Sequence, residues 1–269
     1  MSNGLAIVSG AGDLPRLLAE YCAKSGRHYR VVTLENAPID WLETHPTIPA
    51  RIEQISKLCE DLRAEECDTL VFAGAMARPQ VDMSMFDALG GQLAAAVLGA
   101  MKKGDDQTLR YVIEMFEGQG FDVVGPSEIL PELVPPIGVL TARVPSEIER
   151  ADAVLAREFI AALGKLDIGQ GAIVAHGLCL GLETIQGTDK MLEFVATTRP
   201  DSGGVLVKAL KPGQDTRMDM PVIGVQTVQN AARAGLGGIA IQAGGVMIIN
   251  RADVIAAANA LGLTLWAIS

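Results

Sequence analysis

The chain has 269 residues, 49% of them hydrophobic and only 4% aromatic, which predicts a folded protein with an aliphatic core. Its formal net charge of -10 argues against nucleic acid as a general partner, because neutralising phosphates along a strand needs a basic face. No apolar run reaches the roughly 18 residues of a membrane span, and the N-terminus lacks a secretory-signal pattern. The four cysteines show no CxxC spacing, so we expect a cytoplasmic protein.

The first half of the chain alternates strands with helices. Apolar strands are expected at residues 5–8, 30–35, 69–73 and 121–124. One intervening helix ends near Gly26, and another has apolar residues at Ile55, Leu58, Cys59 and Leu62. Strands joined by crossover helices are typical of a parallel sheet. We therefore predict an α/β fold in which residues 1–130 form a Rossmann-like parallel-sheet domain.

The second half has a more mixed pattern. Residues 131–145 contain four prolines and little periodicity, which indicates a linker. A helix is expected from Ser146 to about residue 163. The remaining elements are a strand pair within 172–185, a helix at 188–196, strands at 205–210 and 222–225, and a strand–helix–strand unit from 245 to 269. Residues 146–269 are therefore predicted to form a second, mixed α/β domain.

A glycine-rich turn between the first strand and the first helix is the first candidate site. It reads SGAGDLP and contains Gly10, Ala11, Gly12, Asp13 and Leu14. Backbone N–H groups in such a turn can bind a phosphate at the helix N-terminus. A dinucleotide fingerprint would have glycine where Pro15 stands, although Glu35 lies about where its ribose-binding acid falls. A merely tight turn is the alternative, and the pattern slightly favours a nucleotide or phosphate ligand.

Two further stretches of the first half are candidates. FAGAMARP follows the buried strand at 69–73, at the sheet edge where ligands bind in open α/β folds, and it contains Gly74, Ala75, Met76 and Arg78. Arg78 can pair with a phosphate, although an isolated surface arginine is the commoner finding. KKGDDQTLR contains Lys103, Asp105 and Asp106. Its two carboxylates can bind a hard cation, or they can simply stabilise a helix N-terminus.

Three loops of the second half carry polar side chains. Gln170 lies between two glycines in DIGQGAIV, and Thr188 with Asp189 resembles a helix N-cap in ETIQGTDKML. Each is ordinary alone, but the loops can converge on one pocket. The third loop, KPGQDTRMDMP, is charged. Asp215 and Asp219 are possible ligands of a hard metal, while the cations that can neutralise phosphates are Lys208, Lys211 and Arg217. A solvated turn is the alternative interpretation.

The sequence lacks the motifs of several classes of enzyme that act on phosphates. The three histidines, His28, His45 and His176, are too few for a histidine-rich binuclear metal site, and GxxxxGK(S/T) is absent. An enzyme that acts on phosphates would therefore rely on carboxylates and Mg²⁺.

Taken together and in order, these stretches resemble the LpxI-type UDP-2,3-diacylglucosamine pyrophosphatases of lipid A biosynthesis. The resemblance extends from residue 10 to residue 244 and is carried by GAGDLP, FAGAMARP, KGDDQTLR, DIGQGAIV, GLETIQGTDKML, LVKALKPGQDTRMDMPVIGVQTV and AARAGLGGIAIQAG. One departure is the first turn, which is commonly GGGxLP in relatives and SGAGDLP here. It leaves the individual backbone contacts of this turn open.

The resemblance implies Mg²⁺-dependent hydrolysis of UDP-2,3-diacylglucosamine to UMP and 2,3-diacylglucosamine 1-phosphate, by attack of water on the β-phosphorus. The essential acid of the family's TRxDxP motif corresponds to Asp219, which is expected to bind metal or orient water. Asp215, Asp105 and Asp106 are weaker candidates for metal ligands. GAGDLP and FAGAMARP are assigned to the UDP part. A homodimer is implied as well, and the lipid substrate suggests peripheral contact with the inner membrane.

Two other functions compete with this one. An NAD(P)-dependent oxidoreductase would use the first turn and Glu35, and it leaves the loop of Asp219 without a role. A non-catalytic nucleotide-binding module would tolerate Asp219→Asn and need no metal.

Overall fold

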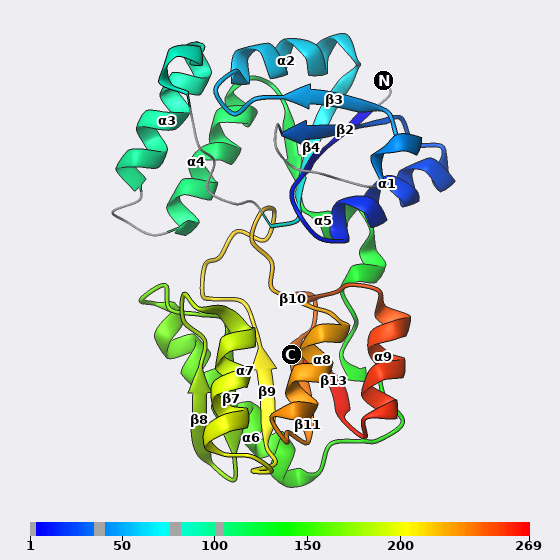
Figure 1. Cartoon of the computed structure of the whole chain (residues 1–269), viewed down its shortest axis with the longest axis vertical. Helices are drawn as coiled ribbons and strands as arrows, with labels where there is room; N and C mark the ends of the chain where they lie inside the picture. The colour runs from blue at the N-terminus through cyan, green and yellow to red at the C-terminus, as the bar shows by residue number, and fades with distance from the viewer. Residues whose placement is uncertain (1–3, 35–40, 76–81, 101–104) are drawn as a thin grey trace. The chain divides into compact units, whose positions relative to one another are not determined.

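A computed structural model describes residues 4–34, 41–75, 82–100 and 105–269 (Figure 1). The chain divides into two compact units. The N-terminal unit comprises Met1–Pro131 together with Asp215–Asp219, and the C-terminal unit comprises Glu132–Gln214 and Met220–Ser269. Among the described residues, no helix is both long and apolar enough to cross a membrane.

The N-terminal unit contains a parallel five-stranded sheet in the order β3-β2-β1-β4-β5. Its strands are β1 (Gly4–Ser9), β2 (Tyr29–Leu34), β3 (Thr47–Ala50), β4 (Cys67–Ala73) and β5 (Asp122–Val124). Its helices are α1 (Leu14–Ser25), α2 (Ile55–Ala64), α3 (Ala88–Ala100), α4 (Asp105–Gly118) and α5 (Pro126–Ile129). The predicted parallel α/β domain is confirmed. The sequence did not indicate β3, an edge strand that tolerates Pro49 because only its inner side pairs with β2.

Helix α2 shows why this unit folds as the pattern predicts. Ile55, Leu58, Cys59 and Leu62 recur at helical spacing, and all four are buried in one hydrophobic cluster. The same cluster contains alternate residues of the buried strands β1 and β4. Met218, from the segment Asp215–Asp219, packs against it.

The C-terminal unit contains a mixed six-stranded sheet in the order β6-β13-β11-β9-β7-β8. Its strands are β6 (Gly138–Val139), β7 (Gly171–Ala175), β8 (Leu178–Leu182), β9 (Val205–Lys208), β11 (Gly238–Gln242) and β13 (Thr264–Ile268). Strands β9, β11 and β13 are parallel, and β6, β7 and β8 run antiparallel to their neighbours. A parallel pair, β10 (Val222–Ile223) with β12 (Met247–Ile248), completes the strands that the structure describes in this unit. The predicted mixed α/β fold is confirmed.

Helices cover both faces of the six-stranded sheet. Strand residues alternate between a cluster that includes α7 (Gly187–Thr198), α8 (Val225–Arg233) and α9 (Arg251–Ala260) and a second cluster that includes α6 (Glu147–Gly164). Leu206 faces the three-helix side, for example, while Val205 and Val207 face α6. This period of two is what a strand buried on both faces requires.

Some expected boundaries differ from the structure. The strand expected at 222–225 ends at Ile223, because Gly224 is the N-cap residue of α8. The strand expected at 205–210 ends at Lys208. Two residues of the proline-rich stretch 131–145 form β6, which pairs with β13.

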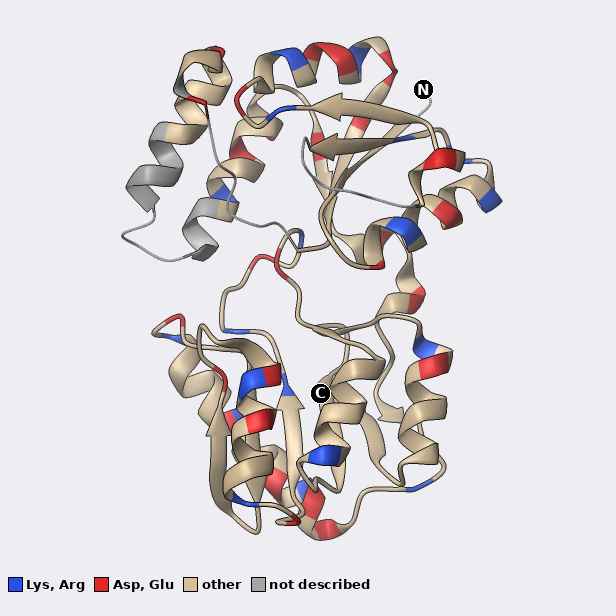
Figure 2. Ribbon diagram, viewed as in Figure 1, with Lys and Arg blue, Asp and Glu red and all other residues tan. Residues whose placement is uncertain are grey.

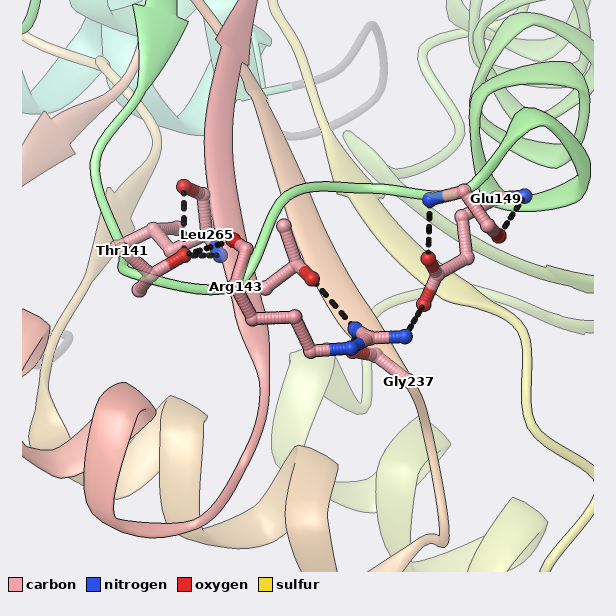
Figure 3. A network of polar contacts seen from close by, with 7 residues as sticks. Thr141, Arg143, Glu149, Gly237 and Leu265 are labelled. Atoms are coloured by element: carbon pink, nitrogen blue, oxygen red, sulfur yellow. Dashed lines mark hydrogen bonds and ion pairs between the residues drawn. The ribbon is translucent and has the colours of Figure 1, made fainter.

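A polar network anchors the chain that follows β6 to the amino-terminal end of this sheet (Figure 3). The Arg143 guanidinium donates to Glu149 Oε1 at 2.8 Å and to the Gly237 carbonyl at 2.6 Å. Thr141 accepts a hydrogen bond from the Leu265 N–H at 3.0 Å. The Glu149 carboxylate also accepts from the Ser146 N–H at 2.7 Å, so the predicted start of α6 is confirmed.

Candidate functional site

Two of the predicted loops meet at the carboxyl ends of β1 and β4. Ala11 and Ala75 form an antiparallel bridge, with N–H···O distances of 2.8 and 2.9 Å. The Gly10 N–H donates to the Ala73 carbonyl at 2.7 Å. Because the carboxyl ends of parallel strands share one edge of a sheet, two loops that are far apart in the sequence become neighbours.

Glycine is required at this contact between the loops. A Cβ atom on Gly10 would lie 2.6 Å from the Ala75 carbonyl oxygen, and one on Gly74 would lie 2.5 Å from the Ala11 carbonyl oxygen. Gly74 also has a φ of +90°, which side-chain-bearing residues rarely adopt. The N–H groups of Gly10, Ala11 and Ala75 thus donate to protein carbonyls. Phosphate binding at this edge would fall to the first turn of α1, where N–H groups lack intrahelical partners.

The segment Asp215–Asp219 is anchored to the N-terminal unit by Arg217. Its guanidinium donates to both oxygens of Asp215, at 3.0 and 2.7 Å, and to Glu117 Oε1 on α4 at 2.7 Å. The Arg217 N–H also donates to Asp215 Oδ1 at 3.0 Å. The Asp219 N–H donates to the Asp215 carbonyl at 3.4 Å. These contacts fix the backbone that carries Asp219.

Charges within this segment are compensated. The hydrogen bonds from Arg217 lower the pKa of Asp215, and Arg110 adds to the effect. Asp215 and Glu117 in turn raise the pKa of Arg217. Arg217, predicted as a phosphate-binding cation, therefore already has two carboxylate partners.

The segment Asp215–Asp219 is compatible with Mg²⁺ binding, but it does not present a preassembled set of metal ligands. Among the residues that the structure describes, no group of three or more His, Cys, Asp or Glu side chains could hold a metal ion. Magnesium commonly binds one or two carboxylates together with phosphate oxygens and water, a mode in which Asp219 would suffice. Both oxygens of Asp215 accept hydrogen bonds from Arg217, so this carboxylate is already engaged within the segment.

Three predicted or neighbouring polar residues converge at the carboxyl end of β9. Lys208 Nζ donates to Thr188 Oγ1 at 2.8 Å, and Thr188 Oγ1 donates to Glu183 Oε1 at 2.8 Å. Lys208 Nζ lies 3.8 Å from the same Glu183 oxygen. Lys208 is 6% exposed and Glu183 is 8% exposed. Sequence reasoning identified Thr188 and Lys208 but not Glu183.

The other predicted residues of the C-terminal unit lie nearby or at the start of α7. Lys211 forms an ion pair with Asp167 at 2.6 Å, and Gln170 Oε1 accepts from Gln214 Nε2 at 3.2 Å. Asp189, in the first turn of α7, accepts from Asn230 of α8 at 2.8 Å. The contacts of this unit thus join Thr188 to Lys208, Lys211 to Asp167 and Gln170 to Gln214. Their convergence on one pocket stays a prediction.

Some expectations fall outside this region. Met76, Arg78, Lys103 and Glu35 lie outside the described residues, and only the backbone of Asp105 and Asp106, at the start of α4, is described. His176 lies in the β7–β8 turn, where its N–H donates to Asp152. β9 begins at that end of the sheet and ends, at Lys208, at the other.

The C-terminal unit also contains an open cavity of about 580 Å³. It lies beside α6, β6 and β13 and includes Ile137, Val154 and Trp266 in its lining. It contains none of the predicted site residues. Basic and acidic residues are interspersed along the ribbons of both units (Figure 2). The predicted site residues therefore lie outside this cavity.

The chain is a two-unit α/β protein with candidate ligand loops in each unit. Its parallel α/β unit has paired loops at the carboxyl edge of the sheet, and its mixed α/β unit has a buried polar cluster. The family model for the LpxI N-terminal domain matches residues 4–133, and that for the LpxI C-terminal domain matches residues 136–266. The chain belongs to the LpxI family.

Comparison with individual proteins agrees with this assignment. The chain is 41% identical over 267 residues to the UDP-2,3-diacylglucosamine pyrophosphatase LpxI of Caulobacter vibrioides, covering 96% of this chain and 95% of that protein. A solved N5-carboxyaminoimidazole synthase from Aspergillus clavatus is 14% identical, with a TM-score of 0.23 over 71% of this chain and 43% of that one. A likeness this weak carries no argument about fold or function.

Proposed function

We propose that the chain is a hydrolase of lipid A biosynthesis, a UDP-2,3-diacylglucosamine pyrophosphatase that releases UMP and 2,3-diacylglucosamine 1-phosphate. The observation that carries this proposal is the 41% identity to the Caulobacter protein over nearly the whole of both chains. The anchored TRMDMP segment supports it, because that segment gives a carboxylate a fixed place in the N-terminal unit.

In the proposed reaction, water attacks the β-phosphorus and UMP leaves. Asp219 holds Mg²⁺ or orients the water, and bound Mg²⁺ would supply positive charge against the pyrophosphate oxygens. Arg217 positions Asp219 through its contacts with Asp215 and Glu117. Asp215, Asp105 and Asp106 remain secondary candidates for metal ligands.

Substrate contacts are proposed for loops of both units. Those assigned to the UDP part are Gly10, Ala11, Gly12, Asp13, Leu14, Gly74, Ala75, Met76 and Arg78. Those assigned to phosphates or sugar are Lys103, Gln170, Thr188, Asp189, Lys208, Lys211 and Arg217. A cytoplasmic location, a homodimer and peripheral contact with the inner membrane stay predictions. Sedimentation with liposomes, in which unbound protein would contradict the membrane contact, tests the last of these.

Hydrolysis of UDP-2,3-diacylglucosamine by the purified protein tests the proposal. We expect UMP release that requires Mg²⁺, stops with EDTA and is lost in Asp219→Ala, with ¹⁸O from labelled water in the sugar phosphate. A folded wild-type protein without turnover, or ¹⁸O in UMP, would contradict the reaction or its direction respectively. Binding of a nicotinamide cofactor by an inactive protein would favour the oxidoreductase alternative.

A further inference from the structure

Glu183 packs against both glycines of the GQG motif, with its carboxylate on Gly171 and its backbone carbonyl on Gly169. A Cβ atom on Gly171 would lie 2.4 Å from Glu183 Oε2, and one on Gly169 would lie 2.0 Å from the Glu183 carbonyl oxygen. The Glu183 N–H also donates to the Gly171 carbonyl at 2.8 Å. The motif thus lacks side chains where this one acidic residue packs, so the two stretches form a single structural feature.

One oxygen of this carboxylate, Oε1, has partners within the protein. The hydrogen bonds run in one direction, from Lys208 Nζ to Thr188 Oγ1 and from Thr188 Oγ1 to Glu183 Oε1. The other oxygen, Oε2, is buried and has no hydrogen-bond partner among the residues that the structure describes. A buried acceptor left unpaired is costly, and such a group in a native protein requires an explanation.

The chemistry around Oε2 restricts what can pair with it. A carboxylate oxygen can only accept, so the partner must be a donor. A phosphate would be repelled by the carboxylate, and a metal cation would be disfavoured by the ammonium of Lys208, 3.8 Å from Oε1. A neutral O–H or N–H group remains. The glucosamine part of the proposed substrate offers such donors in its free hydroxyls and its amide.

We propose that Glu183 Oε2 accepts a hydrogen bond from a hydroxyl or amide N–H of the diacylglucosamine part of the substrate, which makes Glu183 a specificity-determining residue. This inference rests on the proposed pyrophosphatase function. A site built to pair with a substrate O–H or N–H discriminates strongly, because a ligand without that group leaves the buried oxygen unpaired.

Glu183→Gln tests the inference in the full-length protein. It keeps the size of the side chain but can place an NH₂ donor where Oε2 lies. The matched control is Glu193→Gln, an exposed acid on α7 that pairs with Lys190. We expect kcat/KM for UDP-2,3-diacylglucosamine to fall about 10- to 100-fold, mainly through KM, in Glu183→Gln only. The Kd for UDP, which lacks the diacylglucosamine part, should stay unchanged.

Gly171→Ala provides a second test that retains Glu183. Its added methyl group would push against Oε2, so we expect the same rise in KM and the same unchanged Kd for UDP. Thermal unfolding of each variant shows whether a loss of activity reflects unfolding.

The outcomes separate the inference from the function on which it rests. An active wild type with equal kinetics in Glu183→Gln overturns the assignment and means that Oε2 pairs only with water. Weaker UDP binding in that variant overturns the assignment to the diacylglucosamine part in favour of the UDP part. An inactive wild type overturns the proposed function and this inference with it.

Discussion

Arg217 and Glu117 are 100 positions apart in the sequence, and their side chains form an ion pair at 2.7 Å. The same guanidinium donates a hydrogen bond to Asp215, two residues away in the sequence. One arginine therefore joins α4 to the segment that carries Asp219. Loss of this arginine would free that segment without altering the acid itself.

Glu117→Gln should lower kcat for the proposed reaction several-fold while changing stability little. The pair is about one-third exposed at Arg217 and 42% exposed at Glu117, and ion pairs this exposed contribute only about 0–1 kcal/mol to folding. Steady-state kinetics and thermal unfolding measure the two effects. Glu114→Gln, on the same helix, is the control. Equal kcat in both variants would show that the ion pair does not position Asp219.

Asp215→Asn should destabilise the protein at neutral pH and matter less in acid. Arg217 lowers the pKa of Asp215 in the folded state below its value in the unfolded chain. The pair therefore stabilises the folded state above the unfolded-state pKa, about 3.9, and this contribution is lost as pH falls towards the folded-state pKa. Thermal unfolding of both proteins between neutral pH and pH 3 measures this. A difference that grows in acid would contradict the prediction.

Gly74→Ala should weaken UDP binding by about tenfold or more, because a positive φ and a close carbonyl together disfavour any Cβ atom there. The altered loop would pull away from Ala11 and disturb the turn before α1. Isothermal titration with UDP measures the change. Gly118→Ala is the control, since a Cβ atom on Gly118 would meet nothing within 4 Å. Unchanged UDP affinity in Gly74→Ala would separate these loops from the nucleotide.

Arg143→Met should destabilise the protein by about 1–3 kcal/mol, because it leaves the buried Glu149 carboxylate without its charged partner. The exposure of Arg143, 43% of its side chain, keeps the expected loss at this modest level. Denaturant unfolding measures it, with Arg150→Met on α6 as the control. Gly237→Ala should act similarly, since its Cβ atom would lie 2.4 Å from Glu149 Oε1. Wild-type stability in both variants would contradict a structural role for the network.

Local patterns predicted much of the fold. Most buried strands and the apolar positions of α2 follow from periodicity, although β11 was not anticipated. The meeting of the Gly10 and Gly74 loops follows from the shared edge of a parallel sheet. Helix α8 was not anticipated, because the strand expected at 222–225 extended into Val225, the first residue of this helix.

The remaining features depend on contacts between distant parts of the chain. Nothing local to the TRMDMP segment indicates that Arg217 pairs with Glu117 on α4. Glu183 looks like an ordinary loop acid in the sequence, and its burial depends on Gly171, Thr188 and Lys208. Local sequence patterns can indicate that such residues are polar candidates, but they cannot predict which distant residues will contact them.

Because Asp215–Asp219 belongs to the N-terminal unit, this unit can be completed only late in synthesis of the chain. Domains generally fold from the N-terminus as the ribosome releases the chain. Here the N-terminal unit stays incomplete until a segment emerges that is made only after residues 132–214. The last part added to this unit is then the one that carries Asp219, so a truncated nascent chain could fold its sheet and still lack the proposed catalytic acid.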